Sequence, residues 1–197
     1  MPKKNLLIVG DSFSSESLSG LSGWPVLLQQ DFNVTNLSKP GIGEYKILQQ
    51  VKSVDLEKYD LLLLSHTSPN RVHTLTNPLY PPNHLYSNSD IIFTDAESKI
   101  NQHPIARDIV GYYKYIFDLD YYKFIHNSCC QEIDQLTKNT KVLHITHFDW
   151  TDLYQFNSMI NFYNFWLDNR GDVAHYTKQA NQTIYNQLQI KLQEILQ

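Results

Sequence analysis

The sequence contains very little cysteine and no long hydrophobic run. Only two of its 197 residues are cysteines, Cys129 and Cys130, and they are neighbours. Adjacent cysteines rarely pair with each other, which excludes a disulfide framework and favours helix packing over a metal or redox role. The apolar stretch behind the basic residues 1–4 is too short for a signal peptide or a membrane helix. We therefore expect a soluble, cytoplasmic protein that does not contact a membrane.

Charge is also scarce. Charged residues make up 18% of the chain, the net charge is −4, and no basic stripe is present. This pattern excludes nucleic acid as the main partner. Hydrophobic residues make up 42%, which is a globular composition, and the length fits one domain, residues 1–197, that buries its own core.

Short apolar runs alternate with helical patterns along the first 65 residues. The runs predict strands at residues 6–9, 32–37 and 61–64, and the helical patterns lie at 24–30 and 45–54. Further strands are predicted at 142–146 and 160–166, and a terminal amphipathic helix at 177–196. Alternating strands and helices indicate a three-layer α/β/α domain with a mainly parallel sheet of about five strands.

A long stretch, residues 72–139, separates the third and fourth predicted strands. It begins as a proline-containing loop and becomes helical and rich in Tyr and Phe from about residue 105 to residue 136. A simple crossover needs one helix, so this stretch is an insertion. Because it follows a strand end, we expect a lid or substrate wall, the alternative being a helical decoration of the core.

Chemically active residues follow the predicted strands. The carboxyl ends of parallel strands share one edge of an open sheet. The residues expected at that edge are Asp11, Ser12, Gly41, Asn70, His147, and Asp172 with His175 before the last helix.

This set resembles the SGNH, or GDSL-type, serine hydrolase family. Residues 10–14 resemble its first block, Gly41 its second, and Asp172-x-x-His175 its last. The third block, usually Gly-x-Asn-Asp, is replaced by residues 66–71, where Asn70 is taken as the equivalent asparagine and Thr67 or Arg71 could share its role. The resemblance implies a flavodoxin-like fold of the SGNH-hydrolase type, with no metal or organic cofactor.

The residue types suit acyl transfer. A serine hydroxyl needs a base, for which His175 is the candidate, and Asp172 can orient that imidazole and stabilise its cation. The family pattern assigns the oxyanion hole to the backbone N–H groups of Ser12 and Gly41 and the side-chain amide of Asn70.

Other polar residues near the predicted site are expected to have supporting or substrate-binding roles. We expect Asp11 to fasten the turn, and Ser14 and Ser15 to be loop or capping hydroxyls rather than the nucleophile. Arg71 could bind a substrate anion or form a surface ion pair. The candidate substrate-binding residues are Asp11, Gly43, Thr67, Arg71 and His147.

The remaining candidate metal ligands are histidines. His144 and His147 are three residues apart across a strand end but lack an obvious third zinc ligand. We expect His144 to pack and His147 to face the substrate edge, while His66, His73 and His84 line the pocket or are structural. No metal site is predicted.

The predicted function is a serine esterase that deacylates a carbohydrate or small ester through an acyl-enzyme. Transfer of an acyl group to a sugar hydroxyl uses the same chemistry and is an alternative. A non-catalytic carbohydrate-binding protein on the same fold is the alternative from another class. The oligomeric state is left open.

Overall fold

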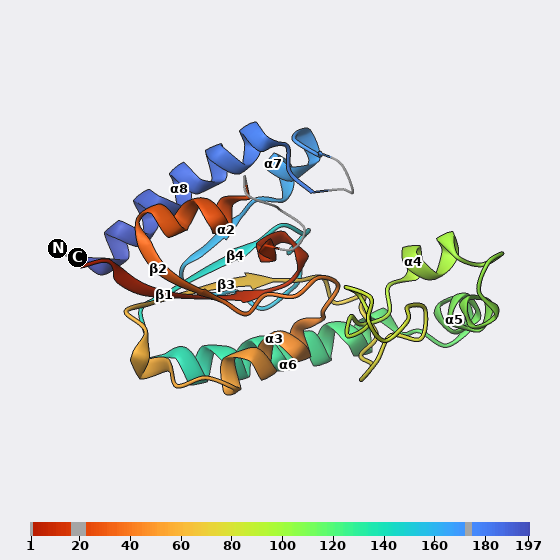
Figure 1. The fold of residues 1–197 in the computed structure, drawn as a ribbon. Helices are drawn as coiled ribbons and strands as arrows, with labels where there is room; N and C mark the ends of the chain where they lie inside the picture. Colours follow the sequence, from red (N-terminus) through yellow and green to blue (C-terminus); the bar gives the residue numbers. More distant parts are fainter. Residues whose placement is uncertain (1, 17–22, 172–174) are drawn as a thin grey trace.

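A five-stranded parallel sheet forms the centre of the protein. The computed structural model describes residues 2–16, 23–171 and 175–197 (Figure 1). The strand order is β2-β1-β3-β4-β5 and every neighbouring pair is parallel. The strands are β1 (Lys4–Gly10), β2 (Phe32–Asn36), β3 (Leu61–His66), β4 (Val142–Thr146) and β5 (Met159–Asn161). This is the order of a flavodoxin-like sheet, which confirms the predicted fold class.

The apolar strands are buried on both faces because their side chains alternate between two cores. Leu6 and Ile8 of β1 pack into one core, and Leu7 and Val9 into the other. Neighbouring β3 continues the pattern in register, with Leu61 paired to Leu6. The continuous run of apolar residues is therefore the signature of a strand covered by helices on both sides.

Helices cover both faces (Figure 1). One face carries α2 (Trp24–Leu27), α7 (Tyr163–Asp168) and α8 (Lys178–Leu196), and the other carries α3 (Glu44–Lys52) and α6 (Leu119–Thr137). The predicted terminal stripe is confirmed, since Ile184, Leu188 and Leu192 of α8 are fully buried. The predicted helix at residues 24–30 is shorter, because its end tightens into a 3₁₀ turn, η3 (Leu28–Gln30).

The predicted fifth strand was wrong in its extent. Residues 160–166 were expected to be extended, but β5 ends at Asn161 and helix α7 follows. The Asn161 side chain contributes to the change, because its Oδ1 accepts a hydrogen bond of 2.8 Å from the Tyr163 N–H and so closes an Asx turn where α7 begins.

The 72–139 stretch divides into two parts with different roles. Helices α4 (Phe93–Ser98) and α5 (Pro104–Tyr115) extend beyond the sheet edge and share a small core of their own (Figure 1). Helix α4 lies where a loop was predicted. Helix α6 instead packs beside α3 under the sheet and is the crossover from β3 to β4. Asp118 separates α5 from α6 by accepting hydrogen bonds from the first N–H groups of α6.

None of the helices in the described part of the chain combines the length and apolar character needed to cross a bilayer.

Candidate functional site

The turn after β1 is built around a buried carboxylate. Asp11 is fully buried, and its Oδ1 accepts a hydrogen bond of 3.0 Å from the Phe13 N–H. Its Oδ2 accepts bonds from Thr67 Oγ1 at 3.1 Å and Arg71 Nη2 at 3.0 Å. Burial raises the pKa of Asp11, although Arg71, these hydrogen bonds and the charge of His175 lower it in part. Asp11 therefore fastens the turn, as expected, and does not face a substrate.

Glycine permits the close approach at the start of this turn. A Cβ atom on Gly10 would lie 2.6 Å from the Ser65 Cβ and the Ser65 carbonyl oxygen of the neighbouring strand β3. No larger residue fits there without moving the backbone. The Gly-Asp-Ser order thus follows from packing: a glycine against β3, a buried carboxylate, and a serine that stays half-exposed.

Ser12 is the most accessible hydroxyl of the turn. It begins the 3₁₀ turn η1 (Ser12–Ser14) and is half-buried, whereas Ser14 is 0% and Ser15 2% exposed. The Ser14 hydroxyl donates to the Asp11 carbonyl oxygen at 3.2 Å. Of the three hydroxyls, Ser12 is the one that a substrate can reach.

The fold brings His175 from the far end of the chain to this turn. Its ring centroid lies 5.1 Å from that of Phe13, the residue after Ser12. The Gly171 N–H donates to the His175 carbonyl oxygen and holds the His175 backbone. Asp172, the predicted third member of the triad, lies outside the described residues.

His147 is buried beneath the same turn, contrary to its predicted position facing the substrate. It is 0% exposed, its ring stacks on Phe13 with centroids 4.5 Å apart, and its Nδ1 is 2.7 Å from the Tyr176 hydroxyl. Burial, aided by the charge of His175, lowers the pKa of His147 to about 3. His147 is thus a neutral packing residue.

The predicted oxyanion residues lie on loops after β2 and β3. Gly41 has a φ of +73°, and a Cβ there would lie 2.6 Å from Ser89 Cβ. Asn70 is exposed, its Oδ1 accepts a hydrogen bond of 2.8 Å from the Ser68 hydroxyl, and its carbonyl accepts one of 3.1 Å from the Tyr113 hydroxyl. Both β2 and β3 are neighbours of β1 in the sheet, so the loops that follow them flank the Ser12 turn. This is the topological switch point, where the strand order reverses.

Three predicted substrate contacts have structural partners instead. The Gly43 N–H donates to Asp90 Oδ2 at 2.6 Å. Arg71 donates from Nη1 to the Ile42 carbonyl at 2.7 Å and from Nη2 to Asp11. Thr67 donates its hydroxyl to Asp11. Arg71 and Thr67 therefore support the turn, and Arg71 forms a buried ion pair rather than the predicted substrate contact or surface pair.

A hollow of about 430 Å³ opens beside Asn70. Aromatic rings from the insertion and charged side chains both line it. The residues that give it this character are Phe93, Tyr113, Phe117, Lys123, Asp149 and Asp152. The hollow joins an apolar surface to hydrogen-bonding groups next to the loop that carries Asn70.

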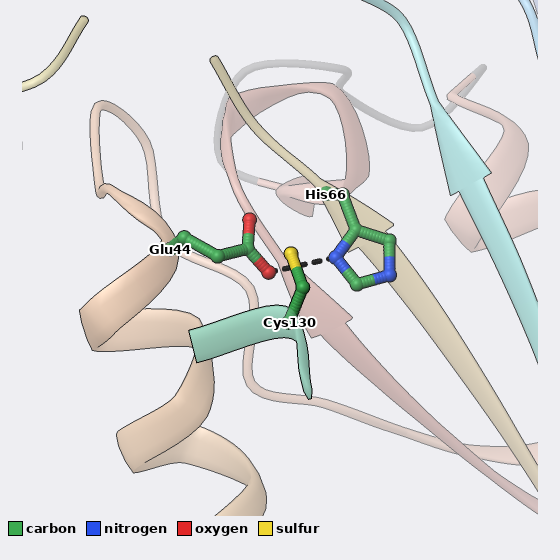
Figure 2. Close-up of side chains that lie close together, drawn as sticks. All are labelled: Glu44, His66 and Cys130. Carbon is green, nitrogen blue, oxygen red and sulfur yellow. Dashed lines mark hydrogen bonds and ion pairs between the residues drawn. The ribbon is translucent and has the colours of Figure 1, made fainter. Parts of the chain in front are cut away.

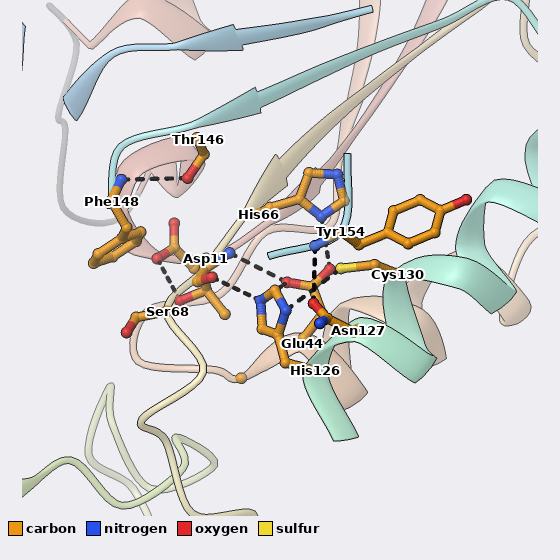
Figure 3. A network of polar contacts seen from close by, with 12 residues as sticks. Asp11, Glu44, His66, Ser68, His126, Asn127, Cys130, Thr146, Phe148 and Tyr154 are labelled. Carbon is orange, nitrogen blue, oxygen red and sulfur yellow. Dashed lines mark hydrogen bonds and ion pairs between the residues drawn. The ribbon is translucent and has the colours of Figure 1, made fainter. Parts of the chain in front are cut away.

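A second polar cluster, which the sequence did not predict, lies under the sheet edge (Figure 3). Glu44, at the start of α3, is 4% exposed, and His66 Nδ1 lies 2.7 Å from its Oε1. The Thr67 N–H donates to Glu44 Oε2 at 3.2 Å. Burial alone would raise the pKa of Glu44, but the charge of His66 and hydrogen bonds from His126 and His66 hold it well below its usual value. In the sequence, Glu44 is only a carboxylate near the start of a predicted helix. Nothing around it indicates the contact with His66.

The comparisons with known proteins name no function. No protein-family model matches the chain, and no curated protein matches it. Among solved structures, the chain is similar to a crystal structure of a Lactobacillus plantarum protein determined in a structural genomics programme. The two are 11% identical, with a TM-score of 0.45 over 98% of each chain.

Proposed function

We propose that this protein is a serine esterase of the SGNH type, with Ser12 as nucleophile and His175 as general base. The observation that carries the proposal is the placement of His175 against the turn that presents Ser12. These residues are 163 positions apart, and a purely structural turn has no need of an imidazole from the far end of the chain.

The reaction follows from the side chains assigned to the site. Ser12 Oγ attacks the ester carbonyl carbon and passes its proton to His175, and the tetrahedral intermediate expels the alcohol, which takes that proton. Water then attacks the acyl-enzyme, His175 removes one of its protons, and the acid leaves with Ser12 Oγ reprotonated. Asp172 is assigned to orient the imidazole.

The oxyanion needs fixed hydrogen-bond donors. We assign this role to the Ser12 and Gly41 N–H groups and the Asn70 side-chain amide. The Ser68 hydroxyl supports the last assignment, because its hydrogen bond to Asn70 Oδ1 fixes which end of the amide carries the free N–H groups. Thr67 and Arg71 are weaker candidates, since Asp11 engages both.

The hollow beside Asn70 supports a carbohydrate ester as the substrate. Aromatic faces such as Phe93 and Phe117 provide surfaces for the apolar faces of sugar rings, and Asp149 and Asp152 can accept hydrogen bonds from sugar hydroxyls. The unpaired cysteines support a cytoplasmic location, where thiols stay reduced.

A fluorophosphonate probe tests the nucleophile directly. We expect stoichiometric labelling of the wild-type protein, none of Ser12→Ala, and full labelling of Ser14→Ala, which removes a buried neighbouring hydroxyl. Labelling that persists in Ser12→Ala, or a folded wild-type protein that does not react, contradicts the proposal. The second result favours a carbohydrate-binding protein.

Acetate release separates the esterase from the acyltransferase. We expect acetylated sugars to release acetate in buffer without an added acceptor sugar, because water resolves the acyl-enzyme. Release that depends on an acceptor sugar, with the acetyl group recovered on that sugar, identifies the transferase instead.

A further inference from the structure

Three potential metal ligands of different chemistry meet in the interior (Figure 2). Glu44 comes from the first turn of α3, His66 from the end of β3 and Cys130 from the middle of α6. A Glu44 carboxylate oxygen, a His66 ring nitrogen and Cys130 Sγ all lie within 4.8 Å of one another. All three residues are at least 96% buried, so solvent does not solvate the carboxylate.

The buried carboxylate lacks a permanent cationic partner. In the described part of the chain, its hydrogen bonds and ion pairs come from His66, His126, the Cys130 thiol and the Thr67 N–H, and no Lys or Arg takes part. A buried negative charge needs a compensating positive charge. Either a protonated imidazole or a metal ion can supply it.

His66 is oriented as a metal ligand would be. Its Nδ1 points to Glu44 (Figure 3). Its Nε2 lies 2.8 Å from His144 Nδ1. Metal-bound histidines usually have their second ring nitrogen held by another protein group, which fixes the tautomer and the ring plane. His144 provides that support here.

His126 lies beside these three ligands and holds the groups around them. Its Nε2 lies 2.9 Å from the Thr67 carbonyl oxygen and 3.4 Å from Glu44 Oε2, and its Nδ1 lies 3.6 Å from Cys130 Sγ. The ligand atoms that lie within 4.8 Å of one another come from Glu44, His66 and Cys130. His126 therefore supports a site with three protein ligands.

We propose that Glu44, His66 and Cys130 form a site for a zinc ion. Three protein ligands leave the fourth tetrahedral position for a water molecule, and the combination of thiolate and imidazole selects zinc over Mg²⁺ or Ca²⁺. The ion displaces the thiol proton of Cys130 and the proton between His66 and Glu44, and both go to solvent. A dication with a carboxylate and a thiolate leaves the buried site neutral.

A small hollow beside the site gives the ion a route from solvent, and binding of the ion would link three elements of the fold. A hollow of about 50 Å³ borders Glu44 and His126 and is also lined by the exposed Tyr45. Bound zinc would join α3, β3 and α6, and so fix the crossover helix and the Thr67 segment against the sheet. This role is independent of the esterase proposal.

Zinc titration of the chelator-stripped, full-length protein tests the site. We expect one zinc per chain, bound tightly enough to compete with a chromophoric chelator, and a tetrahedral Co²⁺ spectrum with a thiolate-to-metal charge-transfer band. Cys129 and Cys130 are adjacent on α6, and only Cys130 belongs to the cluster. We expect Cys129→Ser to bind as the wild type does, and Cys130→Ser to lose the charge-transfer band and at least about 100-fold in affinity.

A second variant guards against a folding defect in Cys130→Ser. His144→Asn removes the support of His66 and leaves all three ligands, so we expect affinity to fall about 10–100-fold with the charge-transfer band kept. The proposal is overturned if the folded wild type binds no zinc in competition with the chelator, if its Co²⁺ complex lacks the thiolate band, or if the two cysteine variants bind equally.

Discussion

Arg71 and Asp11 form an ion pair inside the protein. Arg71 Nη2 lies 3.0 Å from Asp11 Oδ2, and the two side chains are 6% and 0% exposed. Arg71 comes from the loop after β3 and Asp11 from the turn after β1, so the pair joins the two strand ends at the switch point. The position of Ser12 depends on this pair, because Asp11 also receives the Phe13 N–H.

Removing one partner of this pair should be costly. We expect Arg71→Met to lower the free energy of unfolding by about 3–5 kcal/mol, since it leaves a buried carboxylate without its cation. Urea denaturation measures the loss. The exposed Arg107→Met is the matched control and should change stability by less than about 0.5 kcal/mol. Adding Asp11→Asn to Arg71→Met should restore part of the loss, and a purely additive double variant would refute the pairing.

Gly41 should not tolerate a side chain. Its φ of +73° and the 2.6 Å gap to Ser89 Cβ both oppose alanine. We expect Gly41→Ala to lose more than about 1 kcal/mol of stability and to lower kcat by displacing an oxyanion donor. Gly111 lies within α5, and a Cβ there would meet no atom within 4 Å. Gly111→Ala should therefore gain about 0.5–1 kcal/mol, and thermal unfolding of both variants checks the opposite signs.

Asn70 should contribute to the chemical step. If its amide donates to the oxyanion, Asn70→Ala should lower kcat by about 100- to 1,000-fold with little change in KM. Steady-state kinetics on an aryl acetate measures both constants. Thr67→Val keeps the size of the side chain and removes its bond to Asp11, so it should lower stability as well as activity. If Thr67→Val lowers kcat and Asn70→Ala does not, the oxyanion donor is Thr67 and not Asn70.

The buried His147 should make the protein sensitive to acid. Its pKa is lowered to about 3 in the folded state, and it is near 6.5 in an unfolded chain. Between these values the unfolded chain binds a proton that the folded chain does not. The His147 contribution to stability is therefore complete above pH 6.5 and is lost as the pH falls toward about 3, by up to about 1.4 kcal/mol per pH unit.

His147→Asn isolates this contribution. The asparagine side chain can still bond to the Tyr176 hydroxyl but does not titrate. Urea unfolding at several pH values between 4 and 7 should show a shallower pH slope for the variant. Equal slopes for the variant and the wild type would show that His147 does not drive the acid response.

Local sequence patterns were enough to predict the sheet and the turn that carries Ser12. Continuous apolar runs such as residues 61–64 can be buried only between two helical layers, so they fixed the strands and the fold class. Gly10, Asp11 and Ser12 follow such a run, and that local pattern was enough to identify the turn. The edge strand β5 was harder to place, because its three residues carry no comparable apolar run.

Which polar side chains are buried, and which partners they contact, depends on contacts between distant parts of the folded chain. Local spacing does not show that Arg71 turns inward to Asp11, that His147 lies under Phe13, or that Glu44 meets His66 and Cys130. Each of these contacts joins residues 60 or more positions apart or crosses from helix to strand. Burial of a polar group depends on a partner from elsewhere in the chain, and folding alone brings that partner into place.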